Sequence, residues 1–233
     1  MLIDIITLFP EMFAGVFGES IIKRAVNKKI LDIRFTQLRD FAFDKHRQVD
    51  DSPFGGGAGM VLKPEPIYRA VRDVLKKSDE NFSRKIIITD PGGVVFNQAK
   101  AKEFAALDQI IFICGHYEGF DARIYDLADE LISIGDYVLT GGELPAMVIV
   151  DAVARMLPNV LGSAESATTD SFFDGLLGFP QYTRPRDFEG KTVPEVLLSG
   201  NHAEIKKWRE QQALTLTRTR RPDLLQLGVR NEE

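Results

Sequence analysis

The chain is poor in residues that bind metals or form covalent cross-links. It contains a single cysteine, Cys114, which excludes an internal disulfide framework and a cysteine-based zinc site. Its three histidines, His46, His116 and His202, lie too far apart in sequence to match a metal-binding motif. No apolar run approaches the roughly 18 to 20 residues of a membrane span. The amino terminus carries an acid early and no basic leader, so we expect no signal peptide and a cytoplasmic location.

The net charge is low and unevenly distributed. A value of −5 over 233 residues argues weakly against a protein that coats nucleic acid by bulk electrostatics. Residues 1–183 carry 19 Lys/Arg against 26 Asp/Glu, whereas residues 184–230 carry 10 against 6. A basic segment of this kind is typical of a module that docks on an anionic partner. It also lies within the scatter of an ordinary surface, so charge alone leaves both interpretations open.

Three glycine-marked turns, each directly after a short apolar run, are the main motif of the chain. They lie in residues 86–93, 110–119 and 131–142. Runs rich in β-branched residues without polar alternation predict parallel strands buried on both faces, and therefore an α/β fold with a mostly parallel sheet. Ligands bind beyond the carboxyl ends of such strands, and glycine lets backbone groups approach a ligand closely. The turns predict a small-molecule pocket built largely from backbone.

The remaining sequence predicts further elements around this motif. Before residue 160 we expect strands at 1–10 and 31–36, and helices at 10–29, 64–77 and 142–157. Small and polar residues from 158 to 180 are the best candidate for a linker. Beyond them, Asn201 and Glu204 form a capping-box pattern, which predicts a helix that ends near Thr217. A last short helix is expected at 221–225.

The glycine cluster at 55–59 matches no phosphate-binding motif. It is followed by Met60-Val61-Leu62 in place of the Gly-Lys-Ser/Thr of a P-loop. The dinucleotide-binding fingerprint fails as well, because Met60 and Leu62 stand where its last glycine would be needed. A close backbone approach to a partner and a plain flexible turn both remain open.

Three charged residues are candidates for function, each with a structural alternative. Glu118 lies inside the second glycine turn, where a carboxylate has no packing role. Arg155 follows an apolar helical stretch and could simply extend to solvent. Asp170 lies in a segment rich in Ser and Thr, where it could be a loop residue or a helix cap. Composition and spacing do not decide among these roles.

Several segments together resemble the bacterial tRNA (guanine-N(1))-methyltransferases. They are Leu8–Phe13, Gly55–Met60, Cys114–Gly119, Ser133–Met147 and, near the end of the chain, Tyr182–Pro185 and Leu197–Ile205. The resemblance spans essentially the whole chain in order. It implies the SPOUT class, whose parallel α/β sheet carries a deep trefoil knot, here around the second and third turns, plus a small helical carboxyl-terminal domain. It also implies a knotted catalytic domain at 1–160, a flexible linker at 161–180 and a tRNA-binding domain at 181–233.

The resemblance further implies a reaction, a cofactor and an assembly. The family transfers a methyl group from S-adenosylmethionine to N1 of the guanosine immediately 3′ of the anticodon, at tRNA position 37. It acts as a homodimer with active sites shared across the interface. The residues implied to bind the cofactor all lie in the three turns or directly after the third: Ile88, Thr89, Asp90, Pro91, Gly115, Tyr117, Glu118, Gly119, Ile134, Gly135, Asp136, Tyr137, Val138, Leu139, Gly141, Gly142 and Pro145.

The same resemblance implies catalytic roles for the three charged candidates. Guanine N1 carries a proton at neutral pH, and Asp170 matches the general base that removes it. Arg155 matches the residue that stabilises negative charge at O6. Glu118 would shape the cofactor pocket and hold a magnesium ion. The target base would be flipped out of its stack to reach this site.

The resemblance implies tRNA contacts on both parts of the chain: His46, Arg47, Gly55, Gly56, Gly57, Gly59, Ser166, His202, Lys206, Lys207 and Arg209. Two positions depart from the family pattern, with Gly178 in place of an acidic residue and His116 in place of an arginine. Two other functions remain open. One is a SPOUT enzyme that methylates a ribose 2′-hydroxyl, and the other is a non-catalytic RNA-binding protein that retains the fold.

Overall fold

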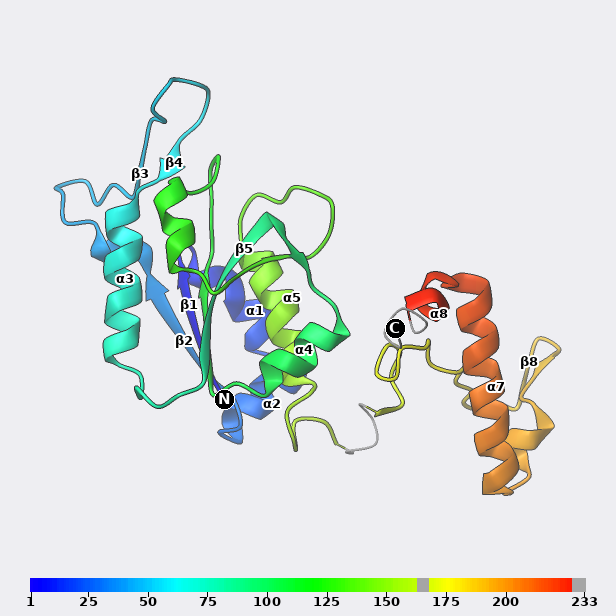
Figure 1. Ribbon diagram of the computed structural model, residues 1–233. Helices are drawn as coiled ribbons and strands as arrows, with labels where there is room; N and C mark the ends of the chain where they lie inside the picture. The colour runs from blue at the N-terminus through cyan, green and yellow to red at the C-terminus, as the bar shows by residue number, and fades with distance from the viewer. Residues whose placement is uncertain (163–167, 228–233) are drawn as a thin grey trace. The chain divides into compact units, whose positions relative to one another are not determined.

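The computed structural model describes residues 1–162 and 168–227, which form two compact units (Figure 1). We call residues 1–162 unit 1 and residues 168–227 unit 2. Unit 1 is an α/β unit, whereas unit 2 is mainly helical and contains one small hairpin. Among the described residues, no helix combines the length and the apolar character needed to cross a membrane.

Unit 1 is built on a five-stranded sheet with strand order β2-β1-β6-β5-β7. Every neighbouring pair in this sheet is parallel, which confirms the predicted mostly parallel arrangement. Strands β1 and β6 are buried along their whole length, as expected of apolar runs without polar alternation. The strands of the sheet are β1 (Leu2–Thr7), β2 (Asp32–Gln37), β5 (Arg84–Val95), β6 (Gln109–Ile113) and β7 (Glu130–Ser133).

Helices pack on both faces of this sheet and enclose two apolar cores. Ile3 and Ile5 of β1 pack in one core with residues of α2, α4 and α5, while Ile6 packs in the other with residues of α3. Successive side chains of a strand point to opposite faces, so one strand contributes to both cores. With η for 3₁₀ helices, the helices of unit 1 are η1 (Pro10–Phe13), α1 (Ala14–Phe17), α2 (Ser20–Asn27), η2 (Leu38–Phe41), α3 (Pro64–Lys76), α4 (Gln98–Ala105), η3 (Ala122–Leu127) and α5 (Glu143–Ala154).

Two segments of unit 1 differ from the sequence prediction. The single helix expected at 10–29 is instead three short ones, because α1 ends at Gly18 and Ser20 adopts a φ of +52°, which interrupts the helical path. Between residues 39 and 62, where the sequence predicts a long polar loop from 39 to 59, the chain forms an antiparallel hairpin of β3 (Asp50–Asp51) and β4 (Val61–Leu62), whose connection holds the glycine cluster. These strands are too short and, in β3, too polar to give a strand pattern.

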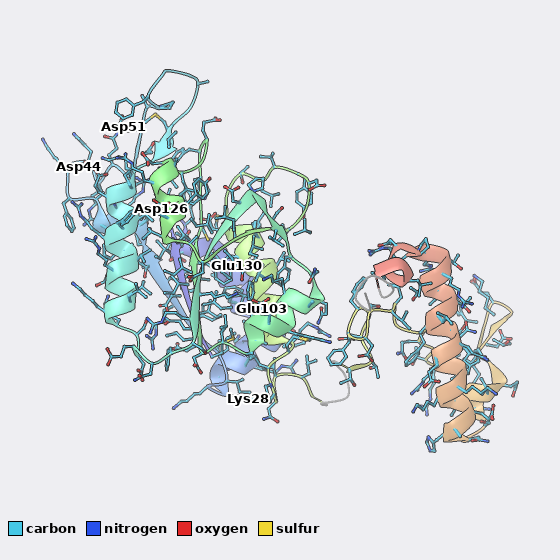
Figure 2. All side chains as sticks on the ribbon, in the orientation of Figure 1. Lys28, Asp44, Asp51, Glu103, Asp126 and Glu130 are labelled. Carbon is cyan, nitrogen blue, oxygen red and sulfur yellow. The ribbon has the colours of Figure 1, made fainter. Side chains whose placement is uncertain are left out.

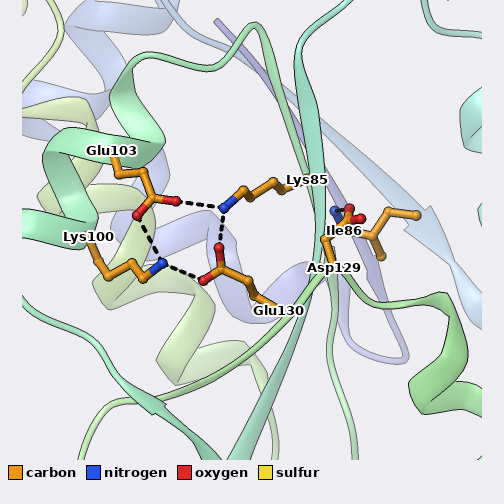
Figure 3. A network of polar contacts seen from close by, with 6 residues as sticks. All are labelled: Lys85, Ile86, Lys100, Glu103, Asp129 and Glu130. Carbon is orange, nitrogen blue, oxygen red and sulfur yellow. Dashed lines mark hydrogen bonds and ion pairs between the residues drawn. The ribbon is translucent and has the colours of Figure 1, made fainter.

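An ion-pair network joins β5, α4 and β7 at one edge of the sheet (Figure 3). Glu103 accepts hydrogen bonds from Lys85 at 2.6 Å and from Lys100 at 2.9 Å. Glu130 also pairs with both lysines, at 2.7 Å from Lys100. The hydrogen bonds from Lys85 and Lys100 lower the pKa of the Glu103 carboxyl. The network holds the edge strand β7 and helix α4 against β5.

Unit 2 is organised around the long helix α7 (His202–Arg220). The side chain of Asn201 accepts a hydrogen bond from the Glu204 amide at 3.3 Å, which confirms the predicted cap. The helix continues past its predicted end near Thr217 to Arg220. The short helix expected after it is present as α8 (Asp223–Leu227), and the remaining elements are β8 (Asp187–Phe188), β9 (Lys191–Thr192) and η4 (Glu195–Leu198).

Candidate functional site

The three glycine turns meet at the carboxyl end of the sheet in unit 1. The second and third turns follow β6 and β7, whereas the first is an irregularity inside β5, where the register with β7 shifts between Thr89 and Val94. Strand β5 pairs with both of the other two strands. Gly142, at the end of the third turn, donates its amide hydrogen to the Gly115 carbonyl of the second turn at 2.9 Å. The Thr89 hydroxyl of the first turn donates to the Gly142 carbonyl at 3.3 Å. Hydrogen bonds therefore connect all three turns at one point.

A small cavity of about 80 Å³ lies between the first and third turns. Tyr137 narrows it, because its ring folds back so closely over Gly135 that a Cβ there would lie 2.5 Å from a ring carbon. Ligand pockets commonly measure about 300 to 1,000 Å³, so a ligand larger than a few atoms requires the third turn to move outward. The implied cofactor residues that line the cavity are Thr89, Asp90, Pro91, Ile134, Gly135, Tyr137, Leu139, Gly141, Gly142 and Pro145.

The remaining cofactor candidates do not line this cavity: Ile88, Gly115, Tyr117, Glu118, Gly119, Asp136 and Val138. Conversely, Ile132 and Ser133 line it and were not among the candidates. Both lie at the end of β7, directly before the third turn. Their position at the carboxyl end of a strand was the signal that could have identified them.

Asp90 in the first turn is held by two hydrogen bonds. Its carboxylate accepts from the Tyr125 hydroxyl at 2.8 Å and from the Gly92 amide at 2.7 Å. Burial and the hydrogen bond to Asp90 raise the pKa of Tyr125 to about 12, so this hydroxyl stays protonated and donates at neutral pH. The first turn is thus fixed by a side chain from η3.

The glycine cluster lies against the second turn. Gly59 approaches Glu118 so closely that a Cβ would lie 2.6 Å from its Oε1, and the Glu118 amide donates to the Met60 carbonyl at 3.0 Å. At Gly55 and Gly56 a Cβ would meet nothing within 4 Å, but both residues have a positive φ that side chains disfavour. The close approach at Gly59 is to a side chain of the same chain, so an approach of the cluster to a partner stays a prediction.

Glu118 is the candidate for the magnesium that the resemblance implies. Within the described ranges of the chain, no group of three or more His, Cys, Asp or Glu side chains could hold a metal ion. Magnesium commonly needs one or two carboxylates together with substrate or water oxygens in octahedral geometry. Glu118 is one carboxylate packed against Gly59, so magnesium at this residue stays a prediction of the resemblance.

His116 and Glu143 form a buried polar pair beside these turns. Glu143, in the first turn of α5, is fully buried, and its Oε2 lies 2.7 Å from Nε2 of His116. Its Oε1 accepts a hydrogen bond from the Thr7 hydroxyl of β1 at 2.5 Å. Burial, together with the nearby Glu143 carboxylate, raises the pKa of the Cys114 thiol, which excludes a reactive thiolate at this position. Sequence reasoning assigned no role in the site to Thr7 or Glu143.

His46 and Arg47 lie in the exposed loop that precedes the β3–β4 hairpin. The His46 amide donates to Asp44 at 2.9 Å, and Arg47 pairs with Asp40 at 3.2 Å. Figure 2 shows Asp44 in this loop at the same end of unit 1 as the hairpin. The hairpin is tied to the second turn, because the Leu62 amide donates to the Gly119 carbonyl at 3.0 Å. The loop, the hairpin and the glycine turns therefore belong to the carboxyl end of the sheet.

The candidate base and several basic candidates share one cavity in unit 2. It measures about 550 Å³ and is lined by Asp170, Gly178, His202, Lys206 and Arg209, among others. Asp170 and Lys206 are exposed side chains. Lys207 is exposed on α7 but does not line the cavity, and Ser166 lies outside the described residues. Arg155 follows the end of α5 in unit 1 and is half-buried.

Residues 168–179 are attached to α7 by specific contacts. The Leu177 amide donates to the Thr217 hydroxyl at 2.9 Å, and the Arg209 guanidinium lies 4.7 Å from the Phe179 ring centre. Within the segment, the Gly178 amide donates to the Ser171 hydroxyl at 2.9 Å. A Cβ at Gly178 would lie 3.4 Å from that same oxygen. The hydrogen bond between the Gly178 amide and the Ser171 hydroxyl therefore fixes the backbone of this segment.

Comparisons with known proteins give one consistent result. The family model described as tRNA (Guanine-1)-methyltransferase TrmD matches residues 1–227. A Staphylococcus haemolyticus protein named tRNA (guanine-N(1)-)-methyltransferase is 57% identical over 97% of this chain and 91% of its own length. Proteins of the same name from Dictyoglomus turgidum and Lactiplantibacillus plantarum are both 54% identical, over 96% and 97% of this chain and 89% and 91% of their own lengths.

Proposed function

Because the chain belongs to the tRNA (guanine-1)-methyltransferase family, we propose that it methylates N1 of the guanosine at tRNA position 37, with S-adenosylmethionine as methyl donor. The observation that carries this proposal is the family match over residues 1–227, which includes the three glycine turns. The family belongs to the SPOUT class, so we assign the trefoil knot to the segments around the second and third turns. The knotted catalytic domain is 1–160, the linker 161–180 and the tRNA-binding domain 181–233.

The three turns are suited to hold S-adenosylmethionine by their backbone. Gly141 and Gly142 leave room that a Cβ would fill, since one at Gly142 would lie 2.8 Å from the Cys114 Cα. Main-chain donors and acceptors at fixed positions suit the adenine ring, and the apolar Pro91, Leu139 and Pro145 suit its faces. The cofactor supplies an electrophilic methyl group. Binding opens the third turn, because the present cavity of about 80 Å³ is too small.

The chain's own residues supply proton transfer and charge stabilisation. The Asp170 carboxylate accepts the proton of guanine N1, which is a poor nucleophile while that proton remains. The Arg155 guanidinium stabilises the negative charge that develops at O6. Glu118 shapes the second turn through its contact with Gly59. The cavity that Asp170 shares with Lys206 and Arg209 suits an anionic RNA segment beside the base.

Exposed apolar side chains support a homodimer with shared active sites. Met12 and Val16, on η1 and α1, and Leu144 and Val148, on α5, are each at least 43% exposed. η1 packs against α5, so these side chains lie on neighbouring elements and suit an interface with a second copy.

If each site combines the turns of one chain with Asp170 of the other, mixing inactive Asp170→Ala and Gly141→Trp chains restores some activity. No recovery after confirmed subunit exchange would contradict a shared site.

The contacts with tRNA involve the basic residues of unit 2 and the loops at the carboxyl end of the sheet. His202, Lys206 and Arg209 line the cavity that contains Asp170, and Lys207 extends the basic surface. His46, Arg47, the glycine cluster and Ser166 complete the proposed contacts. A substrate of this kind places the activity in the cytoplasm.

A pair of unmodified tRNA transcripts tests the function. One carries guanosine at position 37 and the other adenosine, with the rest of the sequence unchanged. We expect methyl transfer from labelled S-adenosylmethionine only to the first, because adenine N1 carries no proton for Asp170 to remove and no O6 for Arg155 to stabilise. Equal labelling of both transcripts would contradict the proposed target.

A further inference from the structure

The buried Glu143 carboxylate joins three segments of unit 1 that are distant in sequence. Its Oε1 accepts from the Thr7 hydroxyl of β1 at 2.5 Å, and its Oε2 lies 2.7 Å from Nε2 of His116 in the second turn. The Thr7 hydroxyl oxygen in turn accepts from the Phe9 amide at 2.9 Å, so its one hydrogen is free to point at Glu143. Nε2 of His116 donates the second bond in the tautomer that carries its hydrogen on this nitrogen.

This carboxylate depends on both partners. Glu143 is fully buried, and a buried charge is costly unless hydrogen bonds replace the water it has lost. Its place in the first turn of α5 adds a favourable interaction with the positive end of the helix dipole. Loss of the Thr7 or His116 donor leaves one carboxylate oxygen unpaired. The group then has to move or recruit water.

The glycine turns surround this carboxylate closely. A Cβ at Gly141 would lie 2.5 Å from Nε2 of His116 and 2.6 Å from Oε2 of Glu143. The next residue, Gly142, bonds the second turn through Gly115 and the first turn through Thr89. A shift of Glu143 or His116 therefore changes the space available to Gly141 and the position of the backbone that joins all three turns.

We propose that Glu143 is a positioning residue, held by Thr7 and His116, that fixes the second and third turns in the arrangement that binds S-adenosylmethionine. The proposal rests on the proposed function, because it assumes that these turns hold the cofactor. An arginine at position 116 can donate the same hydrogen bond to Glu143, so His116→Arg keeps the donor. The proposal predicts an effect on cofactor affinity that is separate from any effect on stability.

Thr7→Val tests the first partner. Valine has nearly the shape of threonine and lacks the hydroxyl, whereas Thr7→Ser keeps it. We expect Thr7→Val to weaken S-adenosylmethionine binding about tenfold, the effect of losing a hydrogen bond to a charged group, and Thr7→Ser to bind almost as wild type. The matched control is Thr217→Val, which removes an equally buried hydroxyl in unit 2 and leaves the cofactor affinity unchanged.

His116→Phe and His116→Arg test the second partner independently. Phenylalanine keeps an aromatic ring for the edge contact with Phe9, whose ring centre lies 4.8 Å from that of His116, but donates no hydrogen bond. We expect His116→Phe to weaken cofactor binding as Thr7→Val does, and His116→Arg to keep it. Both partners act through one carboxylate. The cofactor affinity of the double variant Thr7→Val/His116→Phe should therefore fall by a smaller factor than the two single-variant factors multiplied together.

The measurements are calorimetric titration with S-adenosylmethionine, KM for the cofactor and for tRNA, and the melting temperature of each variant. The proposal expects KM for the cofactor to rise while KM for tRNA stays the same. Variants that melt earlier but bind the cofactor like wild type would overturn it and leave Glu143 with a structural role only. If Thr7→Val does not fold, the two His116 variants decide in the same way. A wild-type chain that fails to bind S-adenosylmethionine would instead refute the proposed function.

Discussion

Gly142→Ala is the substitution whose effect follows most directly from the geometry. A Cβ at Gly142 would lie 2.8 Å from the Cys114 Cα and 2.9 Å from the Gly115 amide nitrogen, and it would also collide with the Thr89 hydroxyl. The backbone angles of Gly142, φ −81° and ψ −5°, are ordinary for alanine, so the substitution adds a steric conflict without backbone strain. Its effect therefore measures how tightly the three turns pack.

The expected loss of stability is that of overpacking a dense interior. Inserting one carbon into such a site costs about 1 to 3 kcal/mol. For a protein of this size, 1 kcal/mol lowers the melting temperature by roughly 2 to 4 °C, so Gly142→Ala should melt about 2 to 12 °C below wild type. Two of the three colliding atoms belong to the backbone of the second turn. That turn must move, so cofactor affinity should fall by about tenfold or more.

Two further variants separate this mechanism from a general effect of alanine. Gly15→Ala in α1 places a Cβ where nothing lies within 4 Å, and we expect it to stabilise the protein by about 0.4 to 1 kcal/mol with unchanged cofactor affinity. Thr89→Ala in the Gly142→Ala background removes the hydroxyl but leaves both backbone contacts, so it should restore only a minor part of the loss. Melting curves and calorimetric titration with S-adenosylmethionine provide both quantities. Wild-type affinity in Gly142→Ala would refute the proposed packing of the turns.

Three other outcomes follow from the same account. Asp170→Asn keeps the side-chain shape but cannot accept the proton, so single-turnover methyl transfer should slow about 10² to 10⁴-fold while cofactor binding stays unchanged; a near-normal rate would exclude Asp170 as the base. Replacing Lys206, Lys207 and Arg209 by alanine should flatten the salt dependence of tRNA binding by removing phosphate contacts, and an unchanged slope would place the RNA surface elsewhere. Glu130→Gln should cost about 2 kcal/mol in urea unfolding at pH 7. Burial opposes ionisation of Glu130, but hydrogen bonds from Lys100 and Lys85 lower the pKa of its carboxyl below the ordinary 4.5. The stability that ionised Glu130 contributes is therefore present above pH 4.5 and is lost as the pH falls through the pKa of the folded state. A stability difference between wild type and Glu130→Gln that persists down to pH 2 would contradict this cause.

Local sequence patterns were sufficient to predict the strands that carry the glycine turns. The apolar runs before Gly92, Gly115 and Gly135 lie in β5, β6 and β7. Of these three strands β6 alone is buried along its whole length, as a continuous apolar run predicts, while β5 also continues through the first turn to Val95. Asn201 similarly revealed the start of α7, because a cap is a local arrangement of side chain and backbone. These features depend only on residues close together in the chain.

The contacts that assemble the site had no such signal. Thr7 and Glu143 are 136 positions apart, and each alone fits an ordinary strand or helix start. The approach of Gly59 to Glu118 depends on the β3–β4 hairpin, whose strands have two residues each. The hydrogen bond from Leu177 to Thr217 uses a backbone amide, which every residue except proline possesses. Long-range pairing of common groups is visible only once the chain is folded.

The most direct measurement of the central claim is the identity of the methylated nucleoside. The purified protein is incubated with methyl-labelled S-adenosylmethionine and unmodified tRNA, and the RNA is digested and separated by mass spectrometry. We predict that the label appears in N1-methylguanosine, at one site per tRNA that carries guanosine at position 37. Label in a ribose-methylated nucleoside, or no label in RNA despite cofactor binding, would contradict the account.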